Sequence, residues 1–365
     1  MRAYKHVGER QRILDSVTFE ESSTLSTKLP LDTVIKKLMI RMSGSVTTTF
    51  GSGTPVADAF SIMDNLVSRI EVAVDGGRVI KSVRPHFMNI QQLLTQKIAG
   101  ERRSSAAAAA ATDNFPTVDQ GFVYGTTGQV STVAETIEIA FECPYVEQKE
   151  ATWLDLRGAS SAQVTFSTRA FSSLLGFGNT APVVFSASTI SFQVTTLEAG
   201  DDVPDLEFWD WRQTTFDESF SGETVERKVK LNTGQKIMGV MMLARDGAAG
   251  TATTATGKLA NNLVLGNIQI TANGSKLIKK TNFKALQAEN RVKFGVSAPM
   301  ASNVSRLDGM AYLQLIERRD IDTALDARDL DSVELYLSTQ AASLVSYTNP
   351  AIVTIMVDEI VIPRR

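Results

Sequence analysis

The chain has 365 residues, of which 43% are hydrophobic and 21% are charged, and its formal net charge is −3. This length suits two domains of ordinary size, each with its own core. The near balance of 37 basic and 40 acidic residues argues against a protein that grips nucleic acid along its whole surface. One cysteine and two histidines exclude a disulfide framework and a metal site of clustered Cys and His ligands, so we expect no cofactor.

The first residues, MRAYKHVGERQR, are basic but contain no apolar segment of the kind that directs secretion. No apolar run in the chain approaches the roughly 20 residues that span a bilayer. We therefore expect synthesis and assembly in the cytosol. In that reducing compartment Cys143 would remain a small, inert side chain.

Most of the chain consists of short segments in which apolar and polar residues alternate. In residues 69–76 the apolar face is formed by Ile70, Val72 and Val74. A period of two with one polar face is typical of a half-buried antiparallel strand. The pattern predicts an all-β protein, with further strands at 135–141, 161–168, 189–196, 332–339 and 352–357.

Tight turns and a few helices interrupt these strands. The dipeptides Asp75-Gly76 and Asn273-Gly274 supply residues that tolerate a positive φ, as a tight turn after a strand requires. Apolar residues at helical spacing predict a short helix at 86–98 and, from a weaker pattern, another at 282–292.

Three stretches have no sustained period. Residues 99–131 and 246–258 are rich in small residues and predict surface loops, which are either functional or disordered. Residues 197–213 combine acidic residues, a proline and two tryptophans. We interpret this third stretch as the connection between two domains.

The second half of the sequence repeats the first. Three blocks recur in the same order: residues 17–22 at 214–219, residues 65–81 at 262–279 with one inserted residue, and residues 152–168 at 323–339. The third block needs no gap and has seven identical residues in 17. Such self-similarity indicates a tandem duplication, and its period is far too long for a solenoid repeat.

Each copy is therefore expected to be a whole domain. Two-sheet jelly rolls of about eight strands are one of the few architectures by which an antiparallel chain limits its exposed edges. If the two halves folded differently, or if one sheet ran continuously through both, this architecture and the function inferred from it would be contradicted. The predicted parts are an N-terminal arm (1–14), a first jelly roll (15–197), a linker (198–213) and a second jelly roll (214–365).

These features resemble the double jelly-roll major capsid proteins of tailless icosahedral viruses, among them membrane-containing bacteriophages such as tectiviruses and corticoviruses. The resemblance covers Val17 to Pro363. It rests on the duplication and on a strand, an Asx-Gly turn and a short helix at matching places in each half. The family is defined by architecture rather than by a short motif, and it has no catalytic residues to carry over.

The resemblance implies a structural protein of the virion capsid and not an enzyme. Three copies would form a homotrimeric capsomer in which six similar domains give a nearly hexagonal outline. The implied partners are further copies of the chain, penton or vertex proteins and minor capsid proteins. An internal lipid membrane is left open, synthesis would take place in the host cytoplasm, and no sequence-specific binding of nucleic acid is expected.

In the family that this chain resembles, the N-terminus often lies on the inner face of the shell. Basic residues there would suit anionic lipid headgroups, at about 1 kcal/mol each near a charged surface. A solvated tail or a strap onto a neighbouring subunit is the alternative that a sparse patch favours. The basic residues of the arm are Arg2, Lys5, Arg10 and Arg12.

Two tryptophans, Trp209 and Trp211, share one face if their segment is extended. Aromatic side chains so placed could stack on sugars. Tryptophan is more often buried, and we expect these two side chains to fill the seam between the domains.

Two other functions remain as alternatives. A tandem jelly-roll adhesin or spike could bind carbohydrate through scattered Trp, Asp and Asn side chains. A hydrolase is disfavoured because His6 and His86 lie in no recognisable catalytic setting. The acidic pairs 201–202 and 358–359 are interpreted as solvated turn residues, since neighbours on an extended chain point to opposite faces.

Overall fold

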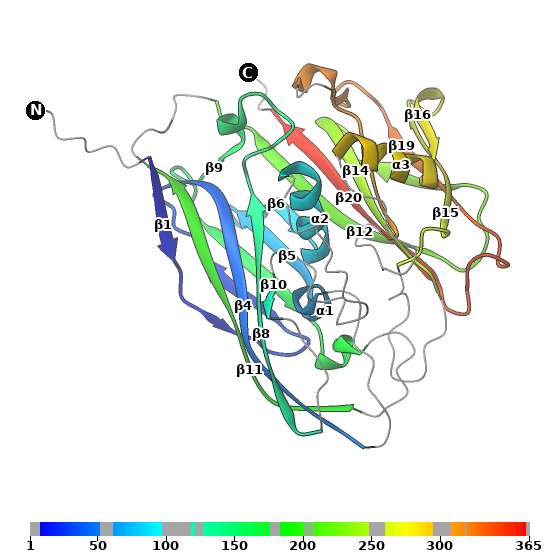
Figure 1. Ribbon diagram of the computed structural model, residues 1–365. Helices are drawn as coiled ribbons and strands as arrows, with labels where there is room; N and C mark the ends of the chain where they lie inside the picture. Colours follow the sequence, from blue (N-terminus) through cyan, green and yellow to red (C-terminus); the bar gives the residue numbers. More distant parts are fainter. Residues whose placement is uncertain are drawn as a thin grey trace, which may run out of the picture.

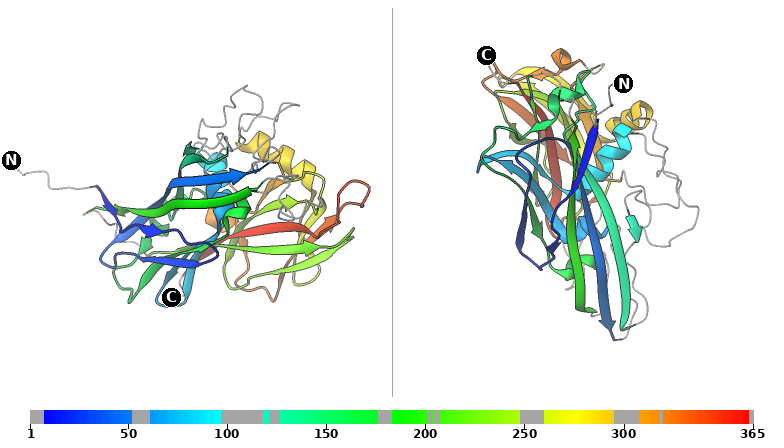
Figure 2. Two further views of the ribbon diagram at one scale, coloured as in Figure 1. Left: turned by 90° about the horizontal axis from the view of Figure 1, so that it is seen from below. Right: turned by 90° about the vertical axis from the view of Figure 1, so that its left-hand side faces the viewer.

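The chain forms two β-rich halves that lie side by side (Figure 1, Figure 2). We call them the first and the second module. The computed structural model describes residues 8–51, 61–96, 118–120, 127–175, 183–200, 203, 207–247, 260–294, 308–317 and 320–362.

The first module consists of two sheets. One has the order β1 (Glu9–Ile13), β11 (Val183–Ala199), β4 (Val34–Phe50), β8 (Gln129–Ala140) and β7 (Val118–Gln120). Two short strands join it, β2 (Val17–Thr18) on β11 and β9 (Leu154–Asp155) on β4. The other has the order β6 (Arg78–Val83), β5 (Val67–Val74), β10 (Ala162–Thr168) and β3 (Thr24–Lys28).

The second module has the same two sheets with the same connectivity. One runs β12 (Asp210–Phe220), β20 (Ala351–Val361), β14 (Lys236–Arg245) and β17 (Met310–Gln314), with β18 (Leu325–Asp326) on β14. The other runs β16 (Lys276–Asn282), β15 (Leu265–Ala272), β19 (Val333–Thr339) and β13 (Arg227–Leu231). Among the described strands, each except β7 thus has a counterpart, with β12 taking the place of β1 and β2 together, and the predicted all-β class and duplication are confirmed.

Hydrogen bonds repeat along with the strands. Asp155 accepts bonds from the backbone N–H and the guanidinium of Arg157, and Asp326 does the same for Arg328. The Oγ1 of Thr168 accepts from the N–H of Ser23 at 2.9 Å, and the equivalent Oγ1 of Thr339 accepts from the N–H of Thr224 at 2.8 Å. The duplication therefore preserved local turn chemistry as well as strand order.

The two predicted Asx-Gly turns are present. Asp75 and Gly76 have φ values of 53° and 74°, and Asn273 and Gly274 have 50° and 75°. Residues with a positive φ at both central positions match the twist of the strands that they connect. The Asp75 carboxylate also accepts a hydrogen bond from the N–H of Ser160 at 2.7 Å, which ties the first turn to the start of β10.

Helices are few, as predicted. The predicted helices correspond to α2 (Pro85–Gln96) and α3 (Phe283–Phe294), and each follows the equivalent strand of its module. A shorter helix, α1 (Ile62–Leu66), begins at Ser61, whose side chain accepts from the N–H of Asp64. None of the helices in the described ranges has both the length and the hydropathy that crossing a bilayer requires. The 3-10 turns are η3 (Lys149–Thr152), η4 (Phe171–Leu174) and η5 (Ile321–Thr323).

The boundaries differ from the predicted ones. Five of the fourteen residues assigned to the N-terminal arm form β1, which pairs with β11. Strands also occupy both ends of the predicted linker, because β11 continues to Ala199 and β12 begins at Asp210. The predicted loop 99–131 contains β7, a turn at 127–128 and the start of β8, while its other residues and most of 246–258 lie outside the described residues.

The modules are less separate than expected. Strand β12 of the second module pairs in parallel with β6 of the first, through Gln213 with Lys81 and Thr214 with Ser82. One nine-stranded sheet therefore runs through both modules, which corrects the expectation of two separate sandwiches. The junction consists of two residue pairs. The sheet that contains β4 in the first module and the sheet that contains β15 in the second module remain separate. The sheet is thus continuous, but the duplication remains clear in the topology.

A close approach between β4 and β11 requires glycine at position 44. A Cβ atom on Gly44 would lie 1.7 Å from the backbone oxygen of Thr189. We expect Gly44→Ala to lower the free energy of unfolding by about 3 kcal/mol, because the strands must move apart. Urea denaturation measures this, with Gly158→Ala as the control, since nothing lies within 4 Å of a Cβ there. Equal midpoints for the two variants would contradict the prediction.

Candidate functional site

The junction between the modules contains a buried lysine. Lys81 has no exposed surface, and its Nζ donates to Oε1 of Gln213 at 2.8 Å. Nε2 of Gln213 donates in turn to Oδ1 of Asp358 at 2.6 Å and to Oε1 of Gln91 at 3.0 Å. These side chains come from β6, α2, β12 and β20, so the network joins both modules.

Burial opposes both charges in this network. It lowers the pKa of Lys81 to about 7, although the Asp358 carboxylate acts in the opposite direction. It raises the pKa of Asp358 to about 6, against hydrogen bonds from Gln213 and the attraction of Lys81. Asp358 and Glu359 are 0% and 2% exposed, so the interpretation of this acidic pair as solvated turn residues is wrong. Both carboxyl groups belong to a strand that is covered on two faces.

Aromatic side chains enclose the ammonium group. The Nζ of Lys81 lies 3.4 Å from the ring centroid of Trp211, a favourable position for a cation over a π-system. Nearby, the rings of Tyr145 and Tyr312 stack with centroids 5.8 Å apart, one from each module. The Sγ of Cys143 contacts the Sδ of Met238 at 3.8 Å, and burial raises the pKa of its thiol to about 12. The junction is therefore a packed interior and not an open site.

The first sheet of the second module is covered on both faces. One face packs on β13, β15 and β19 in the module's own core, through Val240, Met242 and Ile355. The other face belongs to the core of the first module, through Met241, Tyr312 and Met356. The first module therefore supplies the cover for its neighbour's sheet, using α2, β6 and the segment that follows β8.

No protein-family model and no curated protein matches this chain. Solved structures match it along nearly its whole length. The crystal structure of the STIV MCP matches with a TM-score of 0.66 and 15% identity over 97% of both chains. The major capsid protein P2 from bacteriophage PM2 matches with 0.56 and 10% identity over 98% of both chains. The Faustovirus major capsid protein matches with 0.55 and 9% identity, covering 97% of this chain and 90% of that one.

The chain folds as a double jelly roll. The matches cover both halves of the chain, so its overall fold agrees with theirs although one sheet runs through β6 and β12. The condition that such a sheet would contradict the architecture was therefore too strict.

The two tryptophans that we expected to fill the seam differ in how deeply they are buried. Trp211 is 2% exposed and lies in the core that both modules share. Trp209 is partly buried against the same core, and its backbone N–H donates to the backbone carbonyl of Ala151 at 2.7 Å. These positions suit the proposed filling of the seam, Trp211 more directly than Trp209.

The predicted basic residues of the arm are only partly described. Arg10 and Arg12 lie in β1, while Arg2 and Lys5 lie outside the described residues. The guanidinium of Arg12 forms ion pairs with Glu198 at 3.2 Å and Asp32 at 3.4 Å. Its charge is thus already balanced within the chain, which weakens its case as a contact for anionic lipid.

Another buried acid, Glu135, lies in the core of the first module. Oε2 of Glu135 accepts from the N–H of Met63 at 2.8 Å, and burial, aided by the charge of Asp64, raises the pKa of Glu135 to about 8. His86 contacts Asp64 nearby at 3.1 Å. Within the described ranges, no group of three His, Cys, Asp or Glu side chains is placed to hold a metal ion.

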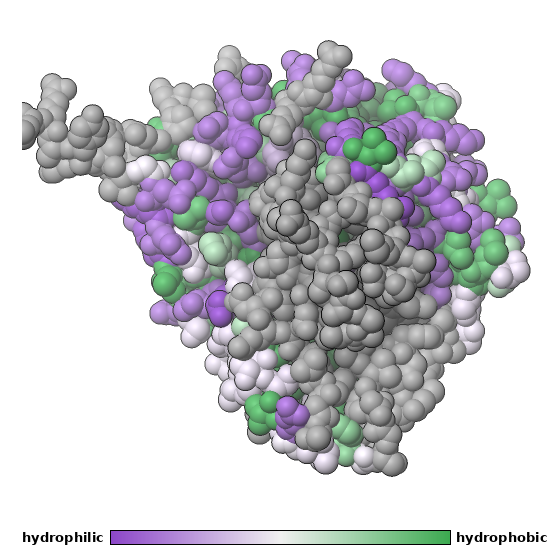
Figure 3. All heavy atoms as spheres, in the orientation of Figure 1, coloured by the Kyte–Doolittle hydropathy of each residue, from purple (hydrophilic) through white to green (hydrophobic). Residues whose placement is uncertain are grey.

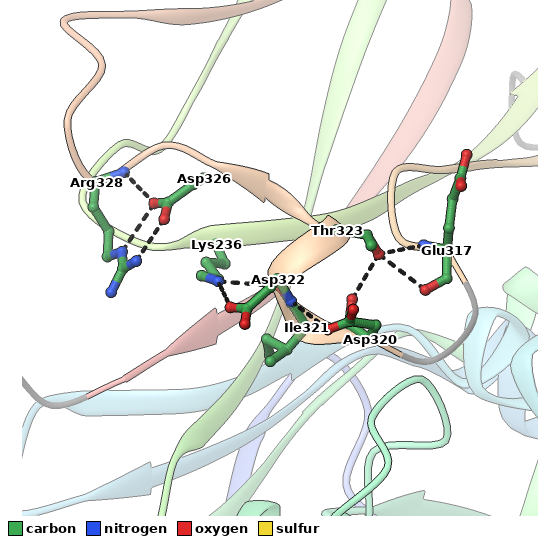
Figure 4. Close-up of polar contacts among 8 residues, drawn as sticks. All are labelled: Lys236, Glu317, Asp320, Ile321, Asp322, Thr323, Asp326 and Arg328. Carbon is green, nitrogen blue, oxygen red and sulfur yellow. Dashed lines mark hydrogen bonds and ion pairs between the residues drawn. The ribbon is translucent and has the colours of Figure 1, made fainter.

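Figure 4 shows polar contacts at one end of the second module. The Nζ of Lys236, only 5% exposed, donates to Asp322 at 2.7 Å and to the carbonyl of Ile321 at 3.1 Å. Thr323 bonds to the backbone of Glu317 and Asp320, which closes the turn around η5. These contacts hold η5 and the turn before it against β14.

A surface hollow of about 330 Å³ lies beside the aromatic rings of Trp153 and Phe208. Rings and acids in a hollow are what a sugar-binding adhesin would need. However, Lys36 lies over Trp153 at 4.8 Å and Arg157 over Phe208 at 5.9 Å. Because cations already occupy positions over both rings, the hollow gives the adhesin alternative little support.

Proposed function

We propose that this double jelly-roll protein is the major capsid protein of a tailless icosahedral virus and has a structural, not an enzymatic, role. The observation that carries the proposal is the agreement in fold with major capsid proteins over nearly the full length of both chains. The duplicated topology supports it, because two equivalent modules per chain can occupy equivalent places around a closed ring.

Three chains would place six similar modules around a threefold axis. A ring of this kind has a nearly hexagonal outline, which tiles the faces of an icosahedral shell. The protein would then reside in the virion capsid, with copies of itself as its main partners. Synthesis in the host cytoplasm, penton or vertex proteins, minor capsid proteins and an internal membrane remain parts of the same proposal.

The division of the chain follows the proposal. Residues 15–197 and 214–365 would be the two jelly rolls of a capsomer subunit, joined by 198–213, with 1–14 as the N-terminal arm. Trp209 and Trp211 would fill the seam between the jelly rolls. Contact of Arg2, Lys5 and Arg10 with the inner face of a shell or a membrane stays a weaker part of the proposal, and Arg12 is the least suited to it because of its ion pairs.

The proposal predicts the oligomeric state of the purified protein. We expect a particle of three 39.6 kDa chains by light scattering, with roughly hexagonal particles in electron micrographs. The trimer should persist on dilution into the nanomolar range, since a capsomer must stay intact in solution until it binds other capsomers. A stable monomer that is retained on a glycan column would contradict the proposal and favour the adhesin.

A further inference from the structure

The contact between the two modules within the chain is a template for contacts between chains. Within the chain, the edge of β6 pairs with the edge of β12, and the segment after β8 covers the outer face of β14 and β20. The duplication gives each of these elements a counterpart. The counterpart of β6 is β16, and the counterparts of β12 are β1 and β2.

The counterpart edges are open. In the part of the chain that the structure describes, β16 pairs with β15 alone, and both β1 and β2 pair with β11 alone. Figure 1 places β16 and β1 on opposite flanks of the molecule. Open edges on opposite flanks are what a head-to-tail ring of copies requires, and an exposed edge that nothing covers invites pairing with another chain.

We propose that β16 of one copy adds in parallel to the β1–β2 edge of the next copy, and that the loop around η5 covers the outer face of that copy's β4 and β11. This inference rests on the proposed trimer and names its contact surface. By the strand registers, Lys279 takes the place of Lys81. Ser16 lies directly before the repeated block at 17–22, as Gln213 lies directly before its copy at 214–219, so Ser16 takes the place of Gln213. These two positions should therefore be neighbours across the contact.

The outer faces of the two equivalent sheets differ in the expected way. In the second module a row across the strands reads Met356, Met241, Tyr312, and it is buried against the first module. The equivalent row in the first module reads Ser191, Ser43, Ala134. The next row replaces Thr354, Leu243 and Met310 with Thr189, Ser45 and Thr132.

Solubility explains this difference. The covered face in the second module forms as the chain folds and never meets water afterwards, so it can be apolar. The equivalent face in the first module is partly exposed, with only Ala134 of the two rows buried. A large apolar patch there would promote aggregation until another copy arrives. In these two rows, small uncharged side chains keep the face soluble and still allow close packing, because their burial costs no desolvation of charge. The adjacent row contains Arg41, whose charge is exposed.

Charge also favours this pairing. β16 and the first turn of α3 carry Lys276, Lys280 and Lys284, all exposed. The opposite flank carries the exposed carboxylates Asp15, Glu20 and Glu21 beside β2, and Figure 3 shows mostly hydrophilic side chains there. Glu198 and Asp32 balance Arg12 on that flank. Opposite charges on the two surfaces would steer copies into the head-to-tail orientation.

Disulfide trapping tests the contact. Neighbouring strands lie about 4.8 Å apart, within the Cα separation that a disulfide bridges. The double variant Ser16→Cys/Lys279→Cys should form covalent trimers on mild oxidation, with most of the protein at three times the chain mass on a non-reducing gel. The native Cys143 is fully buried and should not react. The control is Ser16→Cys/Lys230→Cys, because Lys230 is exposed on β13 at the other edge of the same sheet.

The outcomes separate this inference from the proposed function. Covalent trimers from the Lys279 variant, but not from the Lys230 variant, support the contact. Trimers in solution that never cross-link through Lys279 overturn the contact and leave the capsomer proposal standing. Monomers in solution for both variants and for the wild-type protein overturn the two together. Circular dichroism of each variant establishes that the chains are folded.

Discussion

Replacing Lys81 with methionine is expected to lower the free energy of unfolding by about 3 kcal/mol at pH 7. The substitution keeps most of the apolar volume but leaves the carboxylate of Asp358 in the module junction without its cation. It also removes the donor to Gln213 and the cation above Trp211. Urea denaturation at one fixed protein concentration measures the change, since oligomerisation makes apparent stability depend on concentration.

A paired substitution separates charge from packing. Lys81→Met/Asp358→Asn should regain most of the lost stability, because no buried charge then lacks a partner and the amide still accepts from Gln213. Lys230→Met, at an exposed position of β13, provides the control and should change stability little. A Lys81→Met variant as stable as the wild type would show that the junction does not depend on its buried lysine.

The second large effect concerns pH and Glu135. The pKa of this carboxyl group is raised to about 8 in the folded protein from an ordinary value of 4.5. Between these values the folded state binds more protons than the unfolded state, so the contribution of Glu135 to stability falls as the pH rises. Glu135→Gln removes this contribution. The advantage of the variant over the wild type should therefore grow by about 3 kcal/mol from pH 5 to pH 8.

Denaturant midpoints at several pH values test this prediction, with the difference between variant and wild type as the readout. The difference isolates Glu135, because Asp358, Glu359 and Lys81 titrate in both proteins. A second variant, Glu135→Leu, should show the same trend with pH at lower overall stability, since the N–H of Met63 then loses its acceptor. A difference that stays constant between pH 5 and pH 8 would refute the prediction.

The duplication and the strands could be predicted because both leave local marks in the sequence. Alternating residues reported burial in β5 and β10, and the Asx-Gly turns required residues that accept a positive φ. The third repeated block kept a constant spacing, and its strands β9 and β10 fall at the equivalent positions of β18 and β19. Such signals depend on neighbours along the chain, so a single sequence carries them.

The junction could not be predicted in the same way. The pairing of β6 with β12 involves two residue pairs, and it depends on how the modules dock rather than on any local pattern. The sequence pattern nevertheless indicated that two of the acidic residues are buried. Glu135 has the same parity along its strand as Ile137 and Ile139, and the equivalent position in the second module is Leu313. Asp358 lies in a strand whose two faces are both largely apolar, which indicates cover on both sides.

In the proposed capsomer, the fusion of two modules reduces the number of contacts that must form between chains. One contact between modules forms whenever a single chain folds, at an effective concentration that no free subunit can match. A ring of six modules then needs three contacts between chains rather than six, and its concentration at equilibrium depends on the third power of subunit concentration. Because fewer contacts between chains are needed, fewer kinds of incomplete ring can form. In the proposed capsomer, the methionine-lined seam beside Tyr312 would therefore already be complete before any contact between chains forms.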